Sequence, residues 1–303
     1  MTVPQLLTLL RKSVAAWNND DASSMGAALA FYTLFSVAPL LVMVIAVTSL
    51  LFGADAAQSH ILAELRELTG NAGAQAVEDL LRSANSPAKS ALAVVVGTVV
   101  LLFGATSVFA ELYGDLNRIW RSPSAPRVSG LRHLVRKRIL SFGMILGIGF
   151  LFLVSLVVSA GVAAAGDWWG AHFTRWPLVG HVANFILSLT IYTMGFAMIY
   201  KFLPRAHIAW RDVWIGAAAT AALFEIGRLL IGVYVGMSSV TAMFGTAGSL
   251  VVLLIWVYYS AQIFLLGAEF TRVYAYRSGS HAGEEPPEPP PPRQGRPLTA
   301  TKK

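Results

Sequence analysis

One apolar stretch of the sequence carries an acid and a base near its centre. Residues 214–234 hold Glu225 and Arg228 among aliphatic and small residues, with Trp214 and Tyr234 at the ends as interfacial anchors. A helix of about 20 residues crosses the roughly 30 Å hydrocarbon core of a bilayer, so both charges would lie about midway between its faces. A single charge there costs about 2.5 kcal/mol or more. The stretch therefore predicts a helix that needs polar surroundings.

The spacing of the two charges leaves two interpretations open. Residues at i and i+3 share one face of a helix, so Glu225 and Arg228 can neutralise each other. In a functional site, Arg228 could hold an anionic headgroup or Glu225 could exchange a proton. In a structural role, the pair is an internal salt bridge that fixes the helix register and moves nothing.

Other apolar stretches contain polar residues about one helical turn apart, which places them on one face of each predicted helix. They are Tyr32 and Ser36, then Asn184, Ser188 and Tyr192, and finally Tyr258 and Gln262. We expect these residues to line an intramembrane groove together with Glu225 and Arg228. Three further carboxylates lie near the cytoplasmic ends of predicted helices, where water can solvate them. We expect them to mark the membrane boundary: Glu111, Asp115 and Glu269.

Composition indicates a polytopic membrane protein with an all-α fold. The 303 residues are 55% hydrophobic and only 13% charged, with a mean hydropathy of +0.61, which is outside the range of ordinary soluble domains. Six apolar runs are long enough to cross a bilayer. They cover about residues 26–53, 89–111, 139–165, 181–203, 214–234 and 249–270.

The remaining segments divide the chain into three parts. Residues 1–22 predict an amphipathic interfacial helix with Leu6, Leu7, Leu10, Val14 and Trp17 on one side. Residues 23–277 form the six-helix domain, in which 54–88 predicts two short extracytoplasmic amphipathic helices on either side of Gly70 to Gly73. Residues 278–303 predict a disordered, proline-rich cytoplasmic tail.

The positive charges predict the orientation. Of the 23 Lys and Arg residues, 18 fall on one side of six crossings and four on the other, leaving Arg228 within the membrane. Both termini should therefore be cytoplasmic. The densest basic block, residues 118–138, could bind anionic lipid headgroups, although orientation alone would also produce it. The net charge of +7 does not require a nucleic-acid partner, and no pattern indicates an oligomeric state.

Enzyme chemistry has little support in the sequence. There is no Cys, and the six His residues form no His-x-His or His-x-x-His pair: His60, His133, His172, His181, His207 and His281. A metal-dependent nuclease needs clustered His and carboxylate ligands. Walker and Gly-x-Ser-x-Gly motifs are also missing. We therefore expect no catalytic activity, metal or cofactor.

Three segments resemble the YihY/BrkB inner-membrane family. They are Ala-Ala-Leu-Ala-Phe-Tyr-Thr-Leu-Phe-Ser-Val-Ala-Pro-Leu at 27–40, Glu-Leu-Tyr-Gly-Asp-Leu-Asn-Arg-Ile-Trp at 111–120, and residues 244–271 from Phe-Gly-Thr-Ala-Gly to Gly-Ala-Glu-Phe-Thr. The resemblance covers about residues 20–277. It implies a bacterial six-helix protein of a family linked to envelope integrity, serum resistance and lipid or lipopolysaccharide-precursor traffic. Members of the family were once labelled ribonuclease BN. The scattered His residues of this sequence argue against a metal-dependent nuclease activity.

Two hypotheses of function follow. The first is a multi-pass protein of the bacterial inner membrane that transports lipids or other amphiphiles along the polar groove. The second is an envelope scaffold that transports nothing and recruits partners through its basic loop and tail. A polar groove that reaches Glu225 and Arg228 favours the first, and dry packing around the pair favours the second.

Overall fold

The computed structural model describes residues 3–85, 107–122, 177–237 and 248–285. Within these ranges every regular element is a helix and there is no strand, which confirms the all-α prediction for this part of the chain. The helices are α1 (Val3–Asn19), α2 (Ala22–Phe52), α3 (Ala54–Asn85), α6 (Pro177–Phe202), α7 (Trp210–Met237) and α9 (Gly248–Ser278). Residues 107–119 form a further short helix.

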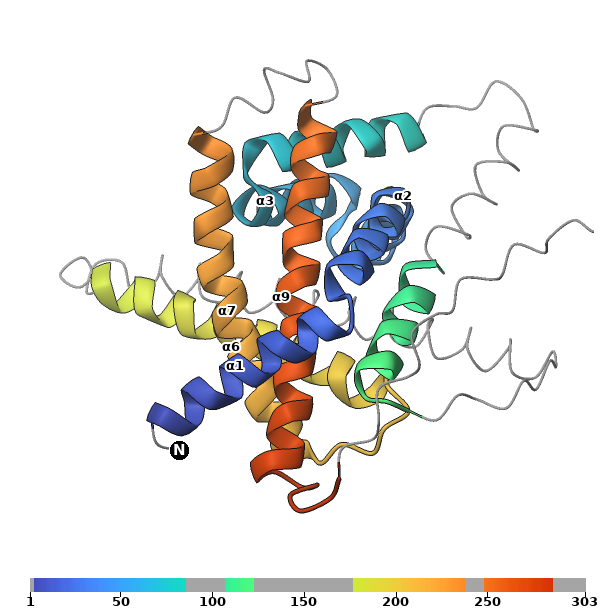
Figure 1. Cartoon of the computed structure of the whole chain (residues 1–303). Helices are drawn as coiled ribbons and strands as arrows, with labels where there is room; N and C mark the ends of the chain where they lie inside the picture. The colour runs from blue at the N-terminus through green and yellow to red at the C-terminus, as the bar shows by residue number, and fades with distance from the viewer. Residues whose placement is uncertain (1–2, 86–106, 123–176, 238–247, 286–303) are drawn as a thin grey trace, which may run out of the picture.

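Helices α7 and α9 lie side by side at the centre of the bundle (Figure 1). Their contact depends on two matched pairs, since a Cβ at Gly216 would overlap Thr271 of α9 and a Cβ at Gly267 would overlap Thr220 of α7. Each threonine hydroxyl donates to a backbone carbonyl one turn earlier on its own helix, at 2.7 Å. Small residues with internally satisfied hydroxyls let two helices approach closely, as in membrane proteins.

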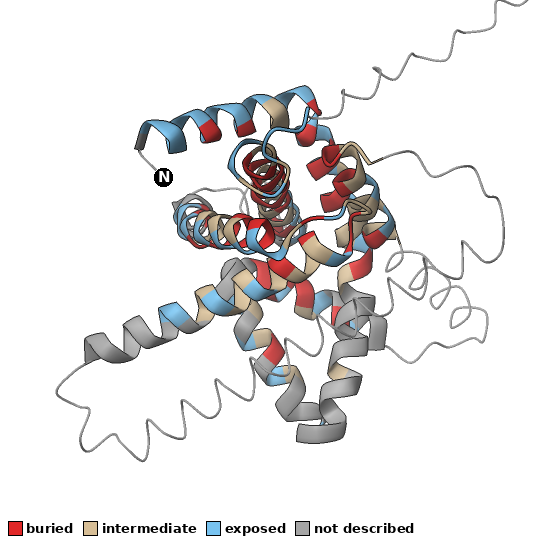
Figure 2. Ribbon diagram, turned by 90° about the horizontal axis from the view of Figure 1, so that it is seen from below, coloured by how far each residue is buried: buried red, intermediate tan, exposed pale blue. Residues whose placement is uncertain are grey.

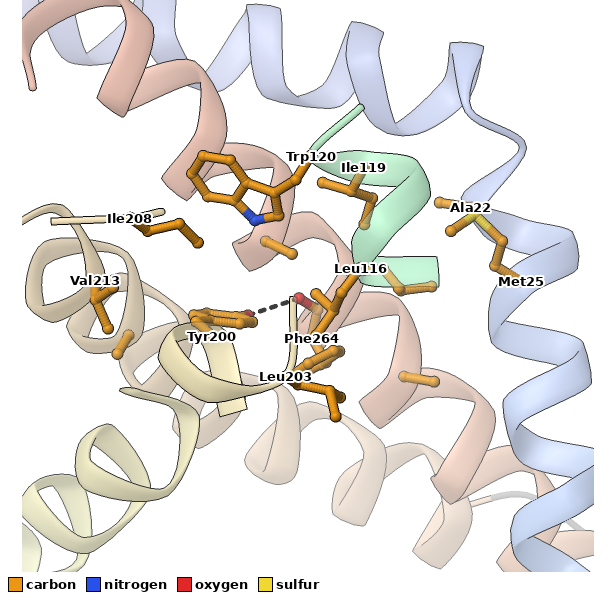
Figure 3. Close-up of a cluster of buried hydrophobic side chains, with 14 of the residues drawn as sticks. Ala22, Met25, Leu116, Ile119, Trp120, Tyr200, Leu203, Ile208, Val213 and Phe264 are labelled. Atoms are coloured by element: carbon orange, nitrogen blue, oxygen red, sulfur yellow. Dashed lines mark hydrogen bonds between the residues drawn. The ribbon is translucent and has the colours of Figure 1, made fainter. Parts of the chain in front are cut away.

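An apolar cluster joins the central helices to α2, α6 and the helix of residues 107–119 (Figure 3). At its centre the hydroxyl of Tyr200 donates to the carbonyl of Phe264 at 2.7 Å and lies 3.1 Å from the Thr220 hydroxyl. Met25, Leu116 and Ile119 approach from the other two helices. The buried phenol therefore has hydrogen-bond partners, as a buried Tyr requires.

Helix α1 packs against α9 through a face other than the predicted apolar one. Leu9 is fully buried against Phe270 and Tyr274 of α9, whereas four of the predicted apolar residues remain exposed, namely Leu6, Leu7, Leu10 and Val14. Figure 2 shows exposed residues along the outer side of α1. The helix thus has one face for the bundle and a separate apolar face.

Helix α3 differs from the prediction of two short helices. One helix runs from Ala54 to Asn85 and includes Gly70 and Gly73, but it is bent, because Ile61 lies in the same apolar cluster as Val77 and Leu81, 16 and 20 residues further on. Ile61, Val77 and Leu81 are buried with Leu253 of α9. Figure 1 shows α3 as two stretches, joined by a bend, at the end of the bundle where α9 begins.

Two helices of the described part are long and apolar enough to cross a membrane, Trp210–Ile231 and Leu250–Ser278, and Ala22–Val37 is a shorter apolar helix. Helices α2 and α6 agree closely with the predicted crossings 26–53 and 181–203. The predicted crossing 139–165 and most of 89–111 lie outside the described residues. The number of six crossings stays a prediction.

The predicted tail begins too early in the sequence. Residues 279–285 fold back on the start of α7, where Asp212 accepts hydrogen bonds from the Ser280 amide at 2.9 Å and the Ser280 hydroxyl at 2.6 Å. His281 stacks on Tyr276, with ring centroids 5.2 Å apart. Asp212 lies in the first turn of α7, where a carboxylate is favoured. The proline-rich residues 286–303 lie outside the described part.

The contact between His281 and Glu284 should make the stability of the C-terminal segment 279–285 depend on pH. A hydrogen bond to the Glu284 carboxylate, 2.8 Å away, raises the pKa of the His281 imidazole. The folded state therefore holds the proton more tightly than the unfolded chain, and this stabilisation is present at acidic pH and is lost as the pH rises through the raised pKa. Because both side chains are partly exposed, we expect at most about 1 kcal/mol. His281→Phe, which retains the ring on Tyr276, should lower the thermal midpoint relative to wild type at about pH 5.5 but not at about pH 8.5.

Candidate functional site

The predicted charged pair forms in the middle of α7. The Arg228 Nη2 atom lies 2.6 Å from Glu225 Oε1, one helical turn away. The Glu225 side chain is 8% exposed and the Arg228 side chain 19% exposed. Glu225 Oε2 is buried and has no hydrogen-bond donor in the described part of the chain. The pair is therefore formed, and its base is reachable from outside the bundle.

The side of α7 that contacts α9 next to this pair is aromatic and aliphatic. A Cβ at Gly227 would meet Tyr259 and Ile263 of α9. Gln262 instead serves the contact with α2, where its Nε2 donates to the Ser23 carbonyl at 3.3 Å and fills the space that a Cβ at Gly26 would need. A larger residue at position 26 would displace the end of the Gln262 side chain.

The other predicted groove residues lie on several surfaces. Ser36 is buried and donates to the Thr33 carbonyl at 3.2 Å, and Tyr32 is half-buried beside Phe31, with ring centroids 5.7 Å apart. Tyr192 packs edge-on against Phe224, with centroids 5.4 Å apart. Ser188 is half-buried, Tyr258 is exposed, and the Asn184 side chain lies outside the described part. A groove that joins these residues to the charged pair stays a prediction.

A second set of charges lies at the opposite end of α9 from α3. Asp20 Oδ1 is 2.9 Å from Arg121 Nη2, and Glu269 Oε2 is 2.9 Å from Arg272 Nη2. The exposed fractions of these four side chains are 10% or less. We call Asp20, Arg121, Glu269 and Arg272 the acid–base cluster. It joins the turn between α1 and α2, the turn after the helix of residues 107–119, and α9.

The backbone places Arg121 in this cluster through an unusual helix end. The Ser122 amide donates to the Asn117 carbonyl at 2.9 Å and the Arg121 amide to the Arg118 carbonyl at 3.1 Å, which is the Schellman pattern. Arg121 therefore has a φ of 51° at a position that usually holds glycine. A left-handed residue other than glycine costs about 1–2 kcal/mol. From this strained position the Arg121 side chain reaches Asp20.

Each carboxyl group of the acid–base cluster has one oxygen on its arginine and one that no arginine reaches. The second oxygens, Asp20 Oδ2 and Glu269 Oε1, are buried and have no hydrogen-bond donor among the described residues. The two carboxyl groups lie within hydrogen-bonding reach of each other. Such buried acceptors normally have a partner, and Arg121 Nε and Nη1 of the same cluster are likewise buried without one.

The members of the acid–base cluster come from three distant parts of the sequence. Glu269 was expected as a boundary carboxylate, yet its side chain is fully buried. Arg121 was assigned to the lipid-binding block 118–138, and its neighbour Arg118 is also paired, 3.4 Å from Asp21. One signal was visible, since Glu269 and Arg272 repeat the i, i+3 spacing of Glu225 and Arg228.

The other two expected boundary carboxylates lie on the helix of residues 107–119. Asp115 is buried and Glu111 half-buried. The same helix binds the connection between α6 and α7, because Asn117 Oδ1 accepts from the Arg205 amide at 2.9 Å and Tyr113 accepts from Arg205 Nε. No group of three potential metal ligands occurs among the described residues.

The known proteins that this chain resembles are also membrane proteins. The chain is similar to the UPF0761 membrane protein RSc1559 of Ralstonia nicotianae, 30% identical over 278 residues that cover 88% of this chain and 58% of that protein. It is also similar to the UPF0761 membrane protein PA0951 of Pseudomonas aeruginosa, 30% identical over 82% of this chain and 58% of that protein. The UPF0761 membrane protein NMB0524 of Neisseria meningitidis is 26% identical over 88% of this chain and 63% of its own length.

The chain thus spans 58% to 63% of the length of these three relatives. No solved structure matches it. The family described as virulence factor BrkB matches residues 13–292. Since this match covers nearly the whole chain, including α7, α9 and both charged sites, the protein belongs to the virulence factor BrkB family of membrane proteins.

Proposed function

We propose that this protein moves a lipid or another amphiphile across the bacterial inner membrane, with both termini in the cytoplasm, and that Arg228 holds the anionic headgroup. The observation that carries the proposal is the exposure of the ion pair. Arg228 retains 19% of its side-chain surface within Trp210–Ile231, the part of α7 that is long and apolar enough to span a membrane. A charge in that position is expensive unless it has a function or a sealed partner.

The surface beside Arg228 suits a lipid. Ile226, Leu229 and Leu230 are exposed on α7 next to the pair, and acyl chains can cover such side chains while the headgroup reaches the base. A guanidinium group binds a phosphate or carboxylate through two parallel hydrogen bonds. Arg228 would thus bind the headgroup while these aliphatic side chains contact the acyl chains.

Glu225 has a distinct role in this proposal. Its contact with Arg228 neutralises the base when no substrate is bound. An anionic headgroup would compete with Glu225 for the guanidinium group, so binding and release would exchange one ion pair for another. This exchange avoids leaving an unpaired charge in the membrane at either stage.

Arg228→Met is expected to lower transbilayer movement of an anionic lipid at least about tenfold, because a charge-assisted hydrogen bond contributes about 1.5–3 kcal/mol. The measurement uses the purified protein in liposomes with fluorescent phospholipids and, separately, lipid A precursors. The matched control is Arg82→Met, which breaks an exposed i, i+4 pair with Glu78 on α3 and should leave movement unchanged.

A double exchange, Glu225→Arg with Arg228→Glu, separates the two roles of the pair. It keeps a salt bridge on one helix face, so folding should survive. If the residues have fixed roles, the exchanged protein folds but moves no lipid. An envelope scaffold would instead function with either arrangement, and a wild-type protein that moves none of the lipids tested would favour that alternative.

A further inference from the structure

In the acid–base cluster two carboxyl oxygens have no hydrogen-bond donor, although Arg121 Nε and Nη1 are also buried there without an acceptor. Arg121 serves one oxygen of Asp20 at 2.9 Å, and Arg272 serves one oxygen of Glu269 with two nitrogens, at 2.9 and 3.1 Å. Asp20 Oδ2 and Glu269 Oε1 are left as buried acceptors. An ionised carboxylate is only an acceptor, so two such groups within hydrogen-bonding reach cannot satisfy each other.

A single proton removes this conflict. When one carboxyl group is protonated, its hydroxyl donates to the facing oxygen of the other, and two unsatisfied acceptors become one hydrogen bond. Hydrogen bonds from a hydroxyl to a carboxylate are short and strong, and two close carboxyl groups commonly share one proton because both do not ionise easily. The Asp20 and Glu269 side chains, 3% and 0% exposed, have little access to water as a substitute donor.

We propose that Asp20 and Glu269 form a proton-binding site, in which the two carboxyl groups hold one proton between them. The charged groups that face Glu269 are Arg272 on its own helix, Asp20 from the α1–α2 turn and Arg121 from the turn after residues 107–119. The two guanidinium groups oppose a metal cation at this position, which leaves the proton as the cation that fits.

The site lies where a proton can alter the bundle. Asp20 belongs to the turn that begins α2, whereas Glu269 lies on the central helix α9. When the proton is released, the O–H bond breaks and the proton passes to water. Two negative charges then face each other between the α1–α2 turn and α9. The α1–α2 turn then separates from α9 more easily. In the transport function proposed above this proton is the coupling ion, but the site is defined by its own geometry.

Infrared difference spectra of the full chain in lipid nanodiscs test the site directly. Between acidic and alkaline samples, wild type should show the carbonyl stretch of a buried protonated carboxylic acid, shifted in deuterium oxide. Glu269→Gln and Asp20→Asn should each remove that band. The control Asp21→Asn makes the same change one residue away, at an exposed side chain whose φ of 54° also suits asparagine, and should retain it.

The pH dependence of thermal stability is a second test, because the shared proton fixes its direction. A folded state that holds a proton released by the unfolded chain loses stability as the pH rises. The thermal midpoint of wild type should therefore fall between about pH 5 and about pH 9 by more than that of Glu269→Gln, whose amide donates permanently to Asp20. If the band is missing in wild type, or survives in both variants, a water molecule bridges two ionised carboxylates and the proposal is wrong. The infrared band and the pH dependence of stability do not depend on lipid movement, so a protein that moves no lipid would still show both.

Discussion

Replacing Arg121 with Met should lower the free energy of unfolding by about 3–5 kcal/mol, because it leaves Asp20 as a buried charge without its partner. The two side chains are 7% and 3% exposed, and their contact holds the α1–α2 turn against the turn after residues 107–119. The left-handed backbone of Arg121 adds strain that this contact must offset. Denaturant unfolding of the purified protein in mixed micelles measures the loss.

The neighbouring pair supplies the matched control. Arg118 and Asp21 join the same two turns, but their atoms are 3.4 Å apart and their side chains are 34% and 72% exposed. Arg118→Met should therefore cost no more than about 1 kcal/mol. The double variant Asp20→Asn with Arg121→Met removes both charges and should recover part of the stability. Equal losses in the two single variants would contradict the importance assigned to burial.

The helices themselves could be predicted from hydropathy. The apolar runs at 26–53, 181–203, 214–234 and 249–270 correspond to α2, α6, α7 and α9, with ends that differ by up to eight residues. The Glu225–Arg228 contact could be predicted as well, because it depends only on spacing within one helix. Local periodicity is sufficient for both.

Contacts between distant elements could not be predicted in this way. On α1 the predicted apolar residues Leu6, Leu7, Leu10 and Val14 are exposed, whereas Leu9 packs on α9. The acid–base cluster was missed because Asp20 and Arg121 meet only after two helix ends adopt left-handed residues, at Asp21 and Arg121. Asp tolerates that conformation better than most residues, but neither Asp21 nor Arg121 marks it in a sequence as glycine does.

The largest effect expected at the centre of the bundle comes from one methyl group. Gly267→Ala should destabilise the protein by about 1–3 kcal/mol, as overpacking of a filled core does. The added Cβ would overlap the Thr220 hydroxyl and lie 2.7 Å from the Tyr200 hydroxyl. Both hydroxyls take part in the contact that joins α6, α7 and the Phe264 carbonyl of α9. Relief of the overlap therefore requires α7 and α9 to separate or Tyr200 to lose a partner.

Gly195→Ala is the control for the same chemical change. Gly195 lies within α6, and a Cβ there would meet nothing within 4 Å. The substitution should be neutral or stabilise the protein by up to about 1 kcal/mol, because alanine favours the helix over glycine. Thermal unfolding of both variants in the same detergent compares them. If Gly267→Ala is as stable as Gly195→Ala, α7 and α9 do not pack at Thr220 and Gly267, and the burial of Tyr200 must have another cause.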